Sequence, residues 1–297
     1  MANTFFSIIV PVYNRSKLVG ETLDSILAQS FEEFEVLVVD DESTDDSLEV
    51  LRDYAKRDNR VKVIALSENQ GRCAARNAGI KAAKGNWICH LDSDDFYYNN
   101  HLQTFYDLIQ EFPSQKAFAS EQTWDKKSKE YNKEKLKQDL VELSIEDFIE
   151  SNPISANQLC YHNSLKMLWS EENIPISEDW LFHKLLSLKS TILKKNILTT
   201  DVRIHDERSL DTTSLDNFIY WNRYAAGKFI EFNSEDKDKV NDRVWSYITL
   251  LSANIYLTNG YKWKGFKLLL QSLLSLHTYK NALLYKGILK LFIPKRI

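Results

Sequence analysis

The first hydrophobic stretch of the chain, residues 7–13, reads Ser-Ile-Ile-Val-Pro-Val-Tyr. A run with so few polar positions is typical of a strand buried on both faces of a parallel sheet. Similar strand signals alternate downstream with helical periodicity. The strands are predicted at 35–39, 61–66 and 87–91, and the helices at 18–29, from a cap at Thr44 or Asp45 to about 57, at 74–83 and at 99–112. This dense alternation predicts an α/β protein with a doubly wound sheet flanked by helices.

The second half of the chain predicts a different organisation. Residues 126–138 are dense in Lys and Glu and are expected to form a solvated loop or helix, whereas 177–188 carry the clearest amphipathic helix pattern. After about residue 216 the β-branched residues give way to aromatic and leucine-rich helical patterns. We therefore predict one domain over residues 1–215, followed by a smaller α-helical C-terminal region over 216–297.

The composition fits a globular protein and excludes several other classes. The chain of 297 residues is 43% hydrophobic and 27% charged, which argues against disorder, collagen-like repeats and a polytopic membrane protein. A net charge of -4 makes nucleic acid an unexpected partner. The three cysteines have unrelated spacings and are interpreted as buried thiols, and the N-terminus lacks the basic segment of a signal peptide. We therefore expect a cytoplasmic location.

The charge is unevenly distributed along the chain. Residues 244–297 contain eight Lys and Arg residues and no Asp or Glu. A basic region rich in Leu, Phe, Tyr and Trp can lie on an anionic membrane surface, and the equal alternative is a packed helical region whose lysines face water. The longest uncharged stretch, 244–261, contains several Ser, Thr and Asn residues and is too polar to span a bilayer.

An acidic cluster follows the predicted strand 87–91. Asp92, Asp94 and Asp95 supply carboxylates of the kind that bind Mg²⁺ or Mn²⁺ together with substrate phosphates. The alternative is a helix cap and a polar turn. The segment 14–17 after the first strand has neither the Gly-rich dinucleotide fingerprint nor a Walker A loop, so a bound diphosphate would need another source of positive charge.

Four motifs occur together in the first hundred residues. They read SIIVPVYN at 7–14, VVDDESTD at 38–45, NQG at 69–71 with ARNAG at 75–79, and HLDSDD at 90–95. In this order and spacing they resemble the family 2 inverting glycosyltransferases, which have the GT-A nucleotide-diphospho-sugar-binding fold. The resemblance covers roughly residues 5–215 and is strongest over 5–100. It implies a mixed doubly wound sheet and a sugar transfer from a UDP-sugar donor that depends on Mn²⁺ or Mg²⁺.

The resemblance also implies roles for individual residues. In the nucleotide pocket, Asp41 would accept a hydrogen bond from uracil, Asp40 would hold the loop, and Arg76 would approach the base or the diphosphate. Asp92 would contact the ribose or the donor sugar. Asp94 would coordinate the metal, with Asp95 able to share that duty. The remaining residues expected to line the nucleotide pocket are Pro11, Val12, Tyr13 and Arg15.

An inverting transfer also needs a base that removes the acceptor proton. Glu178-Asp179 resembles the family's Glu-Asp motif, which implies Asp179 as the base; a helix-terminal charge that complements the macrodipole is the alternative. The segment 202–209 resembles one that closes over the donor, where His205 or Arg208 would contact the diphosphate and His205 would also serve as a metal ligand. Trp124 and Trp180 are candidates for stacking on sugar rings or for core packing.

The resemblance and the basic C-terminal region together suggest the acceptor. We expect a saccharide, carried on a membrane lipid, in bacterial capsule, O-antigen or exopolysaccharide synthesis, with the protein peripheral on the inner face of the plasma membrane. Two alternatives belong to other classes. A nucleotidyltransferase would need a Gly-rich triphosphate loop, and a catalytically inactive sugar-nucleotide-binding module would tolerate loss of either acidic site, whereas both acidic sites are present here.

Overall fold

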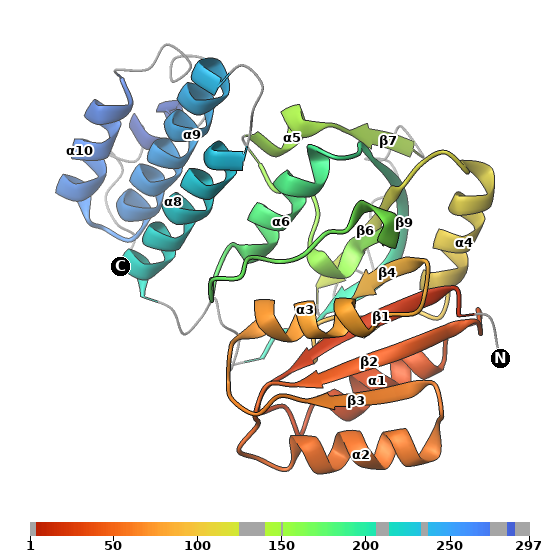
Figure 1. Cartoon of the computed structure of the whole chain (residues 1–297). Helices are drawn as coiled ribbons and strands as arrows, with labels where there is room; N and C mark the ends of the chain where they lie inside the picture. The colour runs from red at the N-terminus through yellow and green to blue at the C-terminus, as the bar shows by residue number, and fades with distance from the viewer. Residues whose placement is uncertain are drawn as a thin grey trace.

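The computed structural model describes residues 4–124, 140–149, 151–205, 214–232, 237–273 and 284–288. Within these residues a sheet of nine strands forms the centre of the molecule (Figure 1). Its first half is parallel, in the order β3-β2-β1-β4. These strands span β1 Phe6–Val12, β2 Phe34–Asp40, β3 Val61–Ala65 and β4 Trp87–His90. All four predicted strands are therefore present.

The second half of the sheet mixes strand directions. β8 (Leu159–His162) runs antiparallel to both β4 and β6 (Ala117–Trp124), and β9 (Ile192–Val202) runs parallel to β6. Two shorter strands, β5 (Phe96–Tyr97) and β7 (Leu140–Leu143), pair antiparallel with β9. The prediction of a doubly wound, mixed α/β sheet is confirmed.

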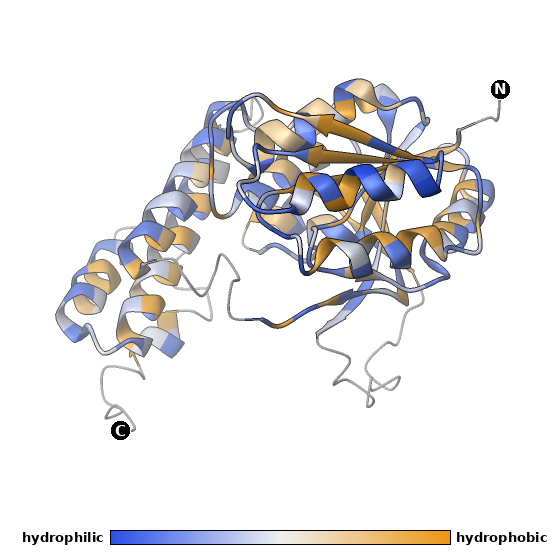
Figure 2. Ribbon diagram, turned by 90° about the horizontal axis from the view of Figure 1, so that it is seen from below, coloured by the Kyte–Doolittle hydropathy of each residue, from blue (hydrophilic) through white to orange (hydrophobic). Residues whose placement is uncertain are grey.

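Helices cover both faces of the sheet. Because successive side chains of a strand point to opposite faces, Ile8 and Val10 of β1 join one core and Ile9 joins the other. The first core also contains residues of α1 (Val19–Leu27) and α4 (His101–Glu111), and the second contains residues of α3 (Arg72–Ala82). Figure 2 shows the resulting pattern: hydrophobic strands lie beside helices that carry both hydrophobic and hydrophilic segments.

Close packing of α3 on the sheet depends on Gly79. A Cβ atom at this position would lie 2.6 Å from the Ile9 side chain, so only glycine lets the helix approach β1 this closely. α2 (Ser47–Arg57) is preceded by Asp46 at its N-cap position, one residue or two beyond the predicted caps Asp45 and Thr44. Asp45 instead accepts hydrogen bonds from the backbone of Ser47 and of Ser16, and thereby joins two loops ahead of the helix.

The C-terminal part of the described chain is helical, as predicted. The predicted helix at 177–188 is α6 (Glu178–Ser187), which packs with α8 and α9 around a core that contains Trp180, Phe229 and Val244. The remaining helices are α5 Ile145–Ile149, α8 Leu215–Phe232, α9 Lys237–Thr258 and α10 Lys262–Ser272. Figure 1 shows α8, α9 and α10 together at one side of the sheet. α8 begins at the predicted boundary, although the division into two domains stays a prediction.

Three further sequence predictions concern membrane spans, the Lys/Glu-rich segment and the cysteines. None of the described helices has the length and hydrophobicity needed to cross a membrane. The predicted loop or helix at 126–138 lies outside the described residues. The three cysteines are free and buried, as the sequence indicated.

Candidate active site

A cavity of about 1310 Å³ lies where β1, β2 and β4 end. In open α/β sheets, ligands bind beyond the carboxyl ends of the strands, because the loops that follow the strands converge there. The wall of this cavity brings together residues from distant segments. Of the residues predicted from the sequence to form the site, it includes Pro11, Val12, Tyr13, Arg15, Asp41, Arg76, Asp92, Asp94, Asp95 and Asp179.

The loop after β1 is tied to the loop after β2. Asn14 has a left-handed backbone conformation (φ 50°), and its Oδ1 accepts a hydrogen bond of 2.8 Å from the backbone N–H of Thr44. The backbone N–H of Arg15 donates to the Ser47 hydroxyl at 2.7 Å. These bonds fix the turn that places Tyr13 and Arg15 in the cavity wall, so the segment lacking a Gly-rich motif is held by side chains instead.

Asp40 and Asp41 make different hydrogen bonds. Asp41 is 3% exposed, and its two carboxylate oxygens accept hydrogen bonds of 2.8 Å from the backbone N–H groups of Gln70 and Gly71, just ahead of α3. The carboxylate is thereby fixed in the cavity wall. Asp40 accepts from the backbone N–H of Ser43 at 3.2 Å, which agrees with the predicted task of holding the loop.

Arg76 forms a buried bridge in the wall of the cavity. Its Nη2 lies 2.7 Å from Asp92 Oδ1 and its Nη1 lies 3.1 Å from Glu178 Oε1, while its guanidinium carbon lies 4.1 Å from the centre of the Trp169 ring. Burial opposes the charge, but the carboxylates of Asp92 and Glu178 raise the pKa of Arg76 above its ordinary value. Arg76 therefore joins α3, the segment after β4 and α6. Its predicted contact with the base or diphosphate stays a prediction.

The three aspartates after β4 have distinct surroundings. Burial alone would raise the pKa of Asp92, but the positive charges of Arg76 and Arg72 hold it below the ordinary value. Asp95 is 5% exposed and accepts hydrogen bonds from the Arg203 backbone N–H at 2.9 Å and from Asn157 Nδ2 at 2.5 Å. Both carboxylate oxygens of Asp95 thus bind the protein itself, and they hold the segment that leads from β9 to His205.

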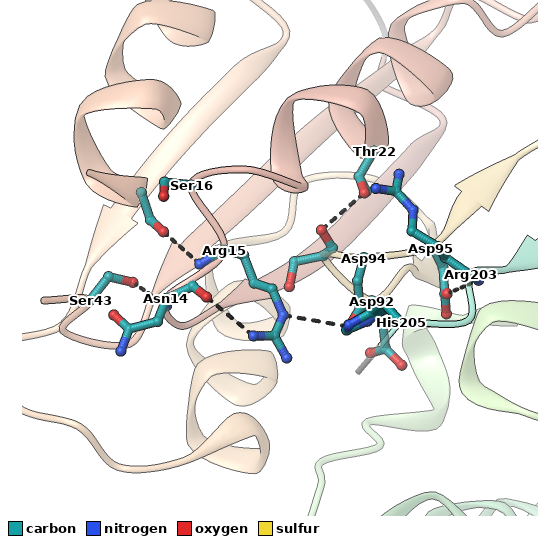
Figure 3. Close-up of polar contacts among 12 residues, drawn as sticks. Asn14, Arg15, Ser16, Thr22, Ser43, Asp92, Asp94, Asp95, Arg203 and His205 are labelled. Carbon is teal, nitrogen blue, oxygen red and sulfur yellow. Dashed lines mark hydrogen bonds and ion pairs between the residues drawn. The ribbon is translucent and has the colours of Figure 1, made fainter. Parts of the chain in front are cut away.

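Asp94 is the aspartate of this cluster that meets His205. Its Oδ2 lies 3.0 Å from His205 Nε2 and 3.4 Å from Arg15 Nε (Figure 3). The structure thus brings together two of the predicted metal ligands, although 111 positions separate them in the sequence. His205 does not line the cavity wall itself but reaches it through Asp94.

The donor set of Asp94 and His205 fits a divalent cation shared with a substrate. Carboxylate oxygen and imidazole nitrogen are ligands that Mn²⁺ accepts, and Mg²⁺ is commonly held by one or two carboxylates plus substrate phosphates. Among the described residues, no group of three His, Cys, Asp or Glu side chains is arranged to hold an ion. The pair therefore suits an ion that a diphosphate would help to bind, rather than one enclosed by protein alone.

Asp179 lies in the first turn of α6, beside the same cavity. Its Oδ1 accepts from the backbone N–H of Trp180 at 2.7 Å, and its Oδ2 accepts from Asn152 Nδ2 at 3.2 Å. Burial and the neighbouring carboxylate of Glu178 raise the pKa of Asp179 to about 7. A carboxylate with a pKa near neutrality is well matched to general-base chemistry.

Several site residues were not predicted from the sequence. Asn152 and Asn157 hold Asp179 and Asp95, Trp169 covers Arg76, and Glu178 neutralises it. Glu178 had a signal, because it belongs to the Glu-Asp pair. The two asparagines and Trp169 had none, because only the folded sheet brings them to the acidic residues.

The fold is that of a GT-A glycosyltransferase. The family model for glycosyl transferase family 2 matches residues 7–168, more than half of the chain, and the chain belongs to this family. The structure resembles S. aureus TarS 1-349 in complex with UDP-GlcNAc, with a TM-score of 0.69 and 22% identity over 97% of this chain and 88% of that one. It also resembles the mannosyltransferase PcManGT from Pyrobaculum calidifontis in complex with GDP-Man and Mn²⁺, with a TM-score of 0.62 and 15% identity over 96% and 86% of the two chains. At these identities the likeness shows the fold.

Sequence relatives match the N-terminal part more closely. The glycosyltransferase GlyG of Streptococcus pneumoniae is 40% identical over 105 residues, which are 35% of this chain and 35% of GlyG. The poly(ribitol-phosphate) beta-glucosyltransferase of Bacillus spizizenii is 43% identical over 108 residues, 35% of this chain and 17% of that protein. The chain thus spans well under two thirds of the length of these curated relatives.

Proposed function

We propose that this protein transfers a sugar from a UDP-sugar to an acceptor hydroxyl with inversion at the anomeric carbon, assisted by Mn²⁺ or Mg²⁺. One observation carries the proposal: Asp41, Asp94 and Asp179, from three distant segments, line a single cavity. Membership of glycosyl transferase family 2 supports the reaction class. The family match disfavours the alternative of a nucleotidyltransferase. The other alternative, an inactive sugar-nucleotide-binding module, is tested by measuring turnover of UDP-sugars.

Uridine recognition is assigned to Asp41. Because two backbone N–H groups fix its carboxylate, lone pairs that remain on its oxygens can accept the N3–H of uracil without a conformational change. TarS, whose structure contains UDP-GlcNAc, supports a UDP-sugar donor, whereas PcManGT contains GDP-Man within the same fold. The choice of nucleotide in this chain therefore depends on Asp41 and on Pro11, Val12 and Tyr13 around it.

Asp94 and His205 would hold the cation beside the diphosphate. A bound Mn²⁺ or Mg²⁺ would act as a Lewis acid that offsets the charge developing on the leaving UDP. Arg15 supplies a further positive charge next to Asp94. The task of these side chains is to position the diphosphate so that the face of the anomeric carbon opposite the leaving oxygen is turned toward Asp179.

Asp179 is proposed to act as the base of a single displacement. The acceptor oxygen forms a bond to the anomeric carbon while its proton passes to the Asp179 carboxylate. The bond between the anomeric carbon and the diphosphate oxygen breaks, and its electron pair leaves with UDP. Because attack and departure occur on opposite faces of the sugar, the configuration inverts. With a pKa of about 7, roughly half of the Asp179 carboxyl groups are ionised at neutral pH, and the ionised form can accept a proton in the transition state.

A saccharide, carried on a membrane lipid, is the proposed acceptor, and α10 is the proposed contact with the inner face of the plasma membrane. Gly265 and Leu269 of α10 are buried against α9, whereas Trp263 (77% exposed), Lys267 and Leu270 are exposed. At spacings of four and seven residues from Trp263, they share a face of the helix. This combination of aromatic, aliphatic and basic side chains is typical of helices at an anionic interface.

Calorimetry of UDP binding, with and without Mn²⁺, tests the proposed site directly. We expect Mn²⁺ to strengthen UDP binding to the wild type, and we expect Asp94→Ala to lose that increment. Lys62→Ala, on the exposed edge strand β3, serves as the matched control and should behave as wild type. If Mn²⁺ leaves the affinity for UDP unchanged in both the wild type and Asp94→Ala, the proposal of a metal-assisted site is overturned.

A further inference from the structure

Asn152 lies between two side chains of α6 that are one helical turn apart. Its Nδ2 lies 3.2 Å from Asp179 Oδ2, and its Oδ1 lies 2.9 Å from His183 Nδ1. Asp179 and His183 are separated by four positions and therefore project from the same face of the helix. A single amide thus contacts the proposed base on one side and a buried imidazole on the other.

The backbone on both sides of Asn152 is fixed to the protein. The indole N–H of Trp180 donates to the Ser151 carbonyl oxygen at 3.0 Å, and Lys194 Nζ donates to the Pro153 carbonyl oxygen at 3.3 Å. Proline at 153 also restricts the residue before it to extended conformations. The amide of Asn152 is therefore presented to α6 from a defined position, although the side chain itself is exposed.

Asp179 and His183 together favour one orientation of the Asn152 amide. The imidazole is fully buried; burial, reinforced by the charges of Arg76 and Lys184, lowers its pKa to about 3, so it is neutral at pH 7. With Asn152 Oδ1 beside it, Nδ1 carries the proton and donates. A reversed amide would place Oδ1 against a carboxylate oxygen of Asp179, which is repulsive. The charge of ionised Asp179 and a hydrogen bond from His183 Nδ1 thus support the same orientation, with the Nδ2 donor toward Asp179.

We propose that Asn152 and His183 are positioning residues for Asp179, with His183 orienting the Asn152 amide so that it holds the Asp179 carboxylate in place and favours its ionised form. This inference rests on the proposed role of Asp179 as the base. The amide fixes one orientation of the carboxylate, so that its remaining lone pairs face the cavity. A hydrogen bond to the charged form also opposes the effects that favour protonation.

The other charged groups around Asp179 come from several elements. Glu178 on its own helix and Asp92 after β4 favour the protonated form, whereas Arg76 of α3 favours the ionised form. Glu121 of β6 and Lys194 of β9 line the same cavity and are paired at 2.7 Å. The segment 151–157 contributes no titratable side chain. The Asn152 amide is thus the contact that this segment offers to the ionised base.

The test is a direct titration of Asp179 by ¹³C carboxyl NMR in aspartate-labelled full-length protein, with the resonance assigned by its absence in Asp179→Asn. In Asn152→Leu, which keeps the shape but lacks the donor, we expect the midpoint to rise by about half a pH unit or more. His183→Phe, which removes the imidazole that binds the Asn152 amide, should raise it as well. His183→Asn should stay near the wild-type midpoint, because its Nδ2 superimposes on the lost Nδ1 donor.

A rate measurement links the titration to function. The kcat for hydrolysis of UDP-sugar should fall about tenfold in Asn152→Leu and His183→Phe at unchanged KM, and the acid limb of the pH profile should move with the NMR midpoint. Unchanged midpoints in both variants would overturn the proposal, whatever the rates. Because Asn152 is exposed, we expect Asn152→Leu to fold. Its titration midpoint therefore tests the proposal even if the buried His183→Phe does not fold. The titration needs neither donor nor acceptor, so it stands or fails separately from the proposed transferase activity.

Discussion

Arg76 Nη1 lies 3.1 Å from Glu178 Oε1, and this buried ion pair links the donor side of the cavity to the helix that carries Asp179. The same guanidinium binds Asp92 through Nη2. Two carboxylates from segments far apart in sequence thus share one guanidinium close to the proposed base. The electrostatic state of Asp179 therefore depends on residues that need not touch the substrate.

The first prediction concerns the charge of Glu178. Glu178→Gln keeps the side-chain shape but removes the negative charge that raises the pKa of Asp179. The pKa should then fall below about 7, while burial, which is the larger cause of the raised value, remains in the variant. Since the base acts when ionised, activity is lost as the pH falls through this pKa, and the acid limb of the kcat profile should move to lower pH. Glu142→Gln, on an exposed position of β7, is the control. An acid limb that stays in place would contradict the electrostatic coupling.

The second prediction concerns the stability supplied by Arg76. Arg76→Met leaves the buried carboxylate of Glu178 and the partly buried one of Asp92 without their shared cation. Breaking a buried pair by removing one partner typically costs about 3 kcal/mol or more of unfolding free energy. Urea denaturation should show this loss at neutral pH, and Arg76→Lys should recover only part of it, because a single ammonium cannot reproduce the forked contact. A loss below about 1 kcal/mol, the size expected for a surface pair, would contradict the bridging role.

The third prediction concerns uridine recognition by Asp41. Each carboxylate oxygen of Asp41 accepts one hydrogen bond, from the backbone N–H of Gln70 or of Gly71. Asp41→Asn replaces one of these oxygens with an NH₂ group, which cannot accept the hydrogen bond that the oxygen accepted. The wall of the nucleotide pocket should shift, and affinity for UMP should fall about tenfold, equivalent to about one lost hydrogen bond. UMP is the probe because it lacks the diphosphate, which separates this effect from metal binding. Equal calorimetric affinities for UMP would remove Asp41 from the uracil contact.

The fourth prediction concerns the exposed face of α10. Trp263→Ala and Lys267→Glu should each reduce binding to vesicles that contain anionic lipid, since a lysine near such a surface contributes about 1 kcal/mol, roughly a fivefold change in partitioning. Lys62→Glu makes the same charge change on the exposed edge strand β3 and should leave binding unaltered. Vesicle sedimentation measures all three. Equal losses in Lys267→Glu and Lys62→Glu would indicate a response to net charge rather than a docking face.

Much of the fold follows from the sequence, for a physical reason. The runs around Ile9, Val38 and Ile88 are hydrophobic throughout because both faces of their strands are buried, and the acidic residues come directly after the strands end. Since the carboxyl ends of parallel strands meet at one edge of the sheet, the pattern also predicts that Asp41 and Asp92 approach one cavity. The helix starting at Glu178 was detectable by its amphipathic period.

The remaining contacts depend on the order of the strands. β8 pairs with β4 and β6, and this pairing brings Asn157 to Asp95 and carries Trp169 toward Arg76. No hydrophobic period encodes the pairing of strands so distant in the chain. The start of α2 was predicted too early for a related reason: Asp45 is engaged by Ser16 from the loop after β1, a contact that local sequence does not reveal.

The proposed transfer requires Asp179 to act as the base at a cavity that binds the donor without help from this side chain. The most direct measurement compares Asp179→Asn with the wild type for UDP binding by calorimetry and for UDP release during turnover of UDP-sugars. The predicted result is an unchanged affinity for UDP together with a fall in kcat of about 10²- to 10⁴-fold. Turnover at the wild-type rate in the folded variant, with unchanged UDP affinity, would contradict the account.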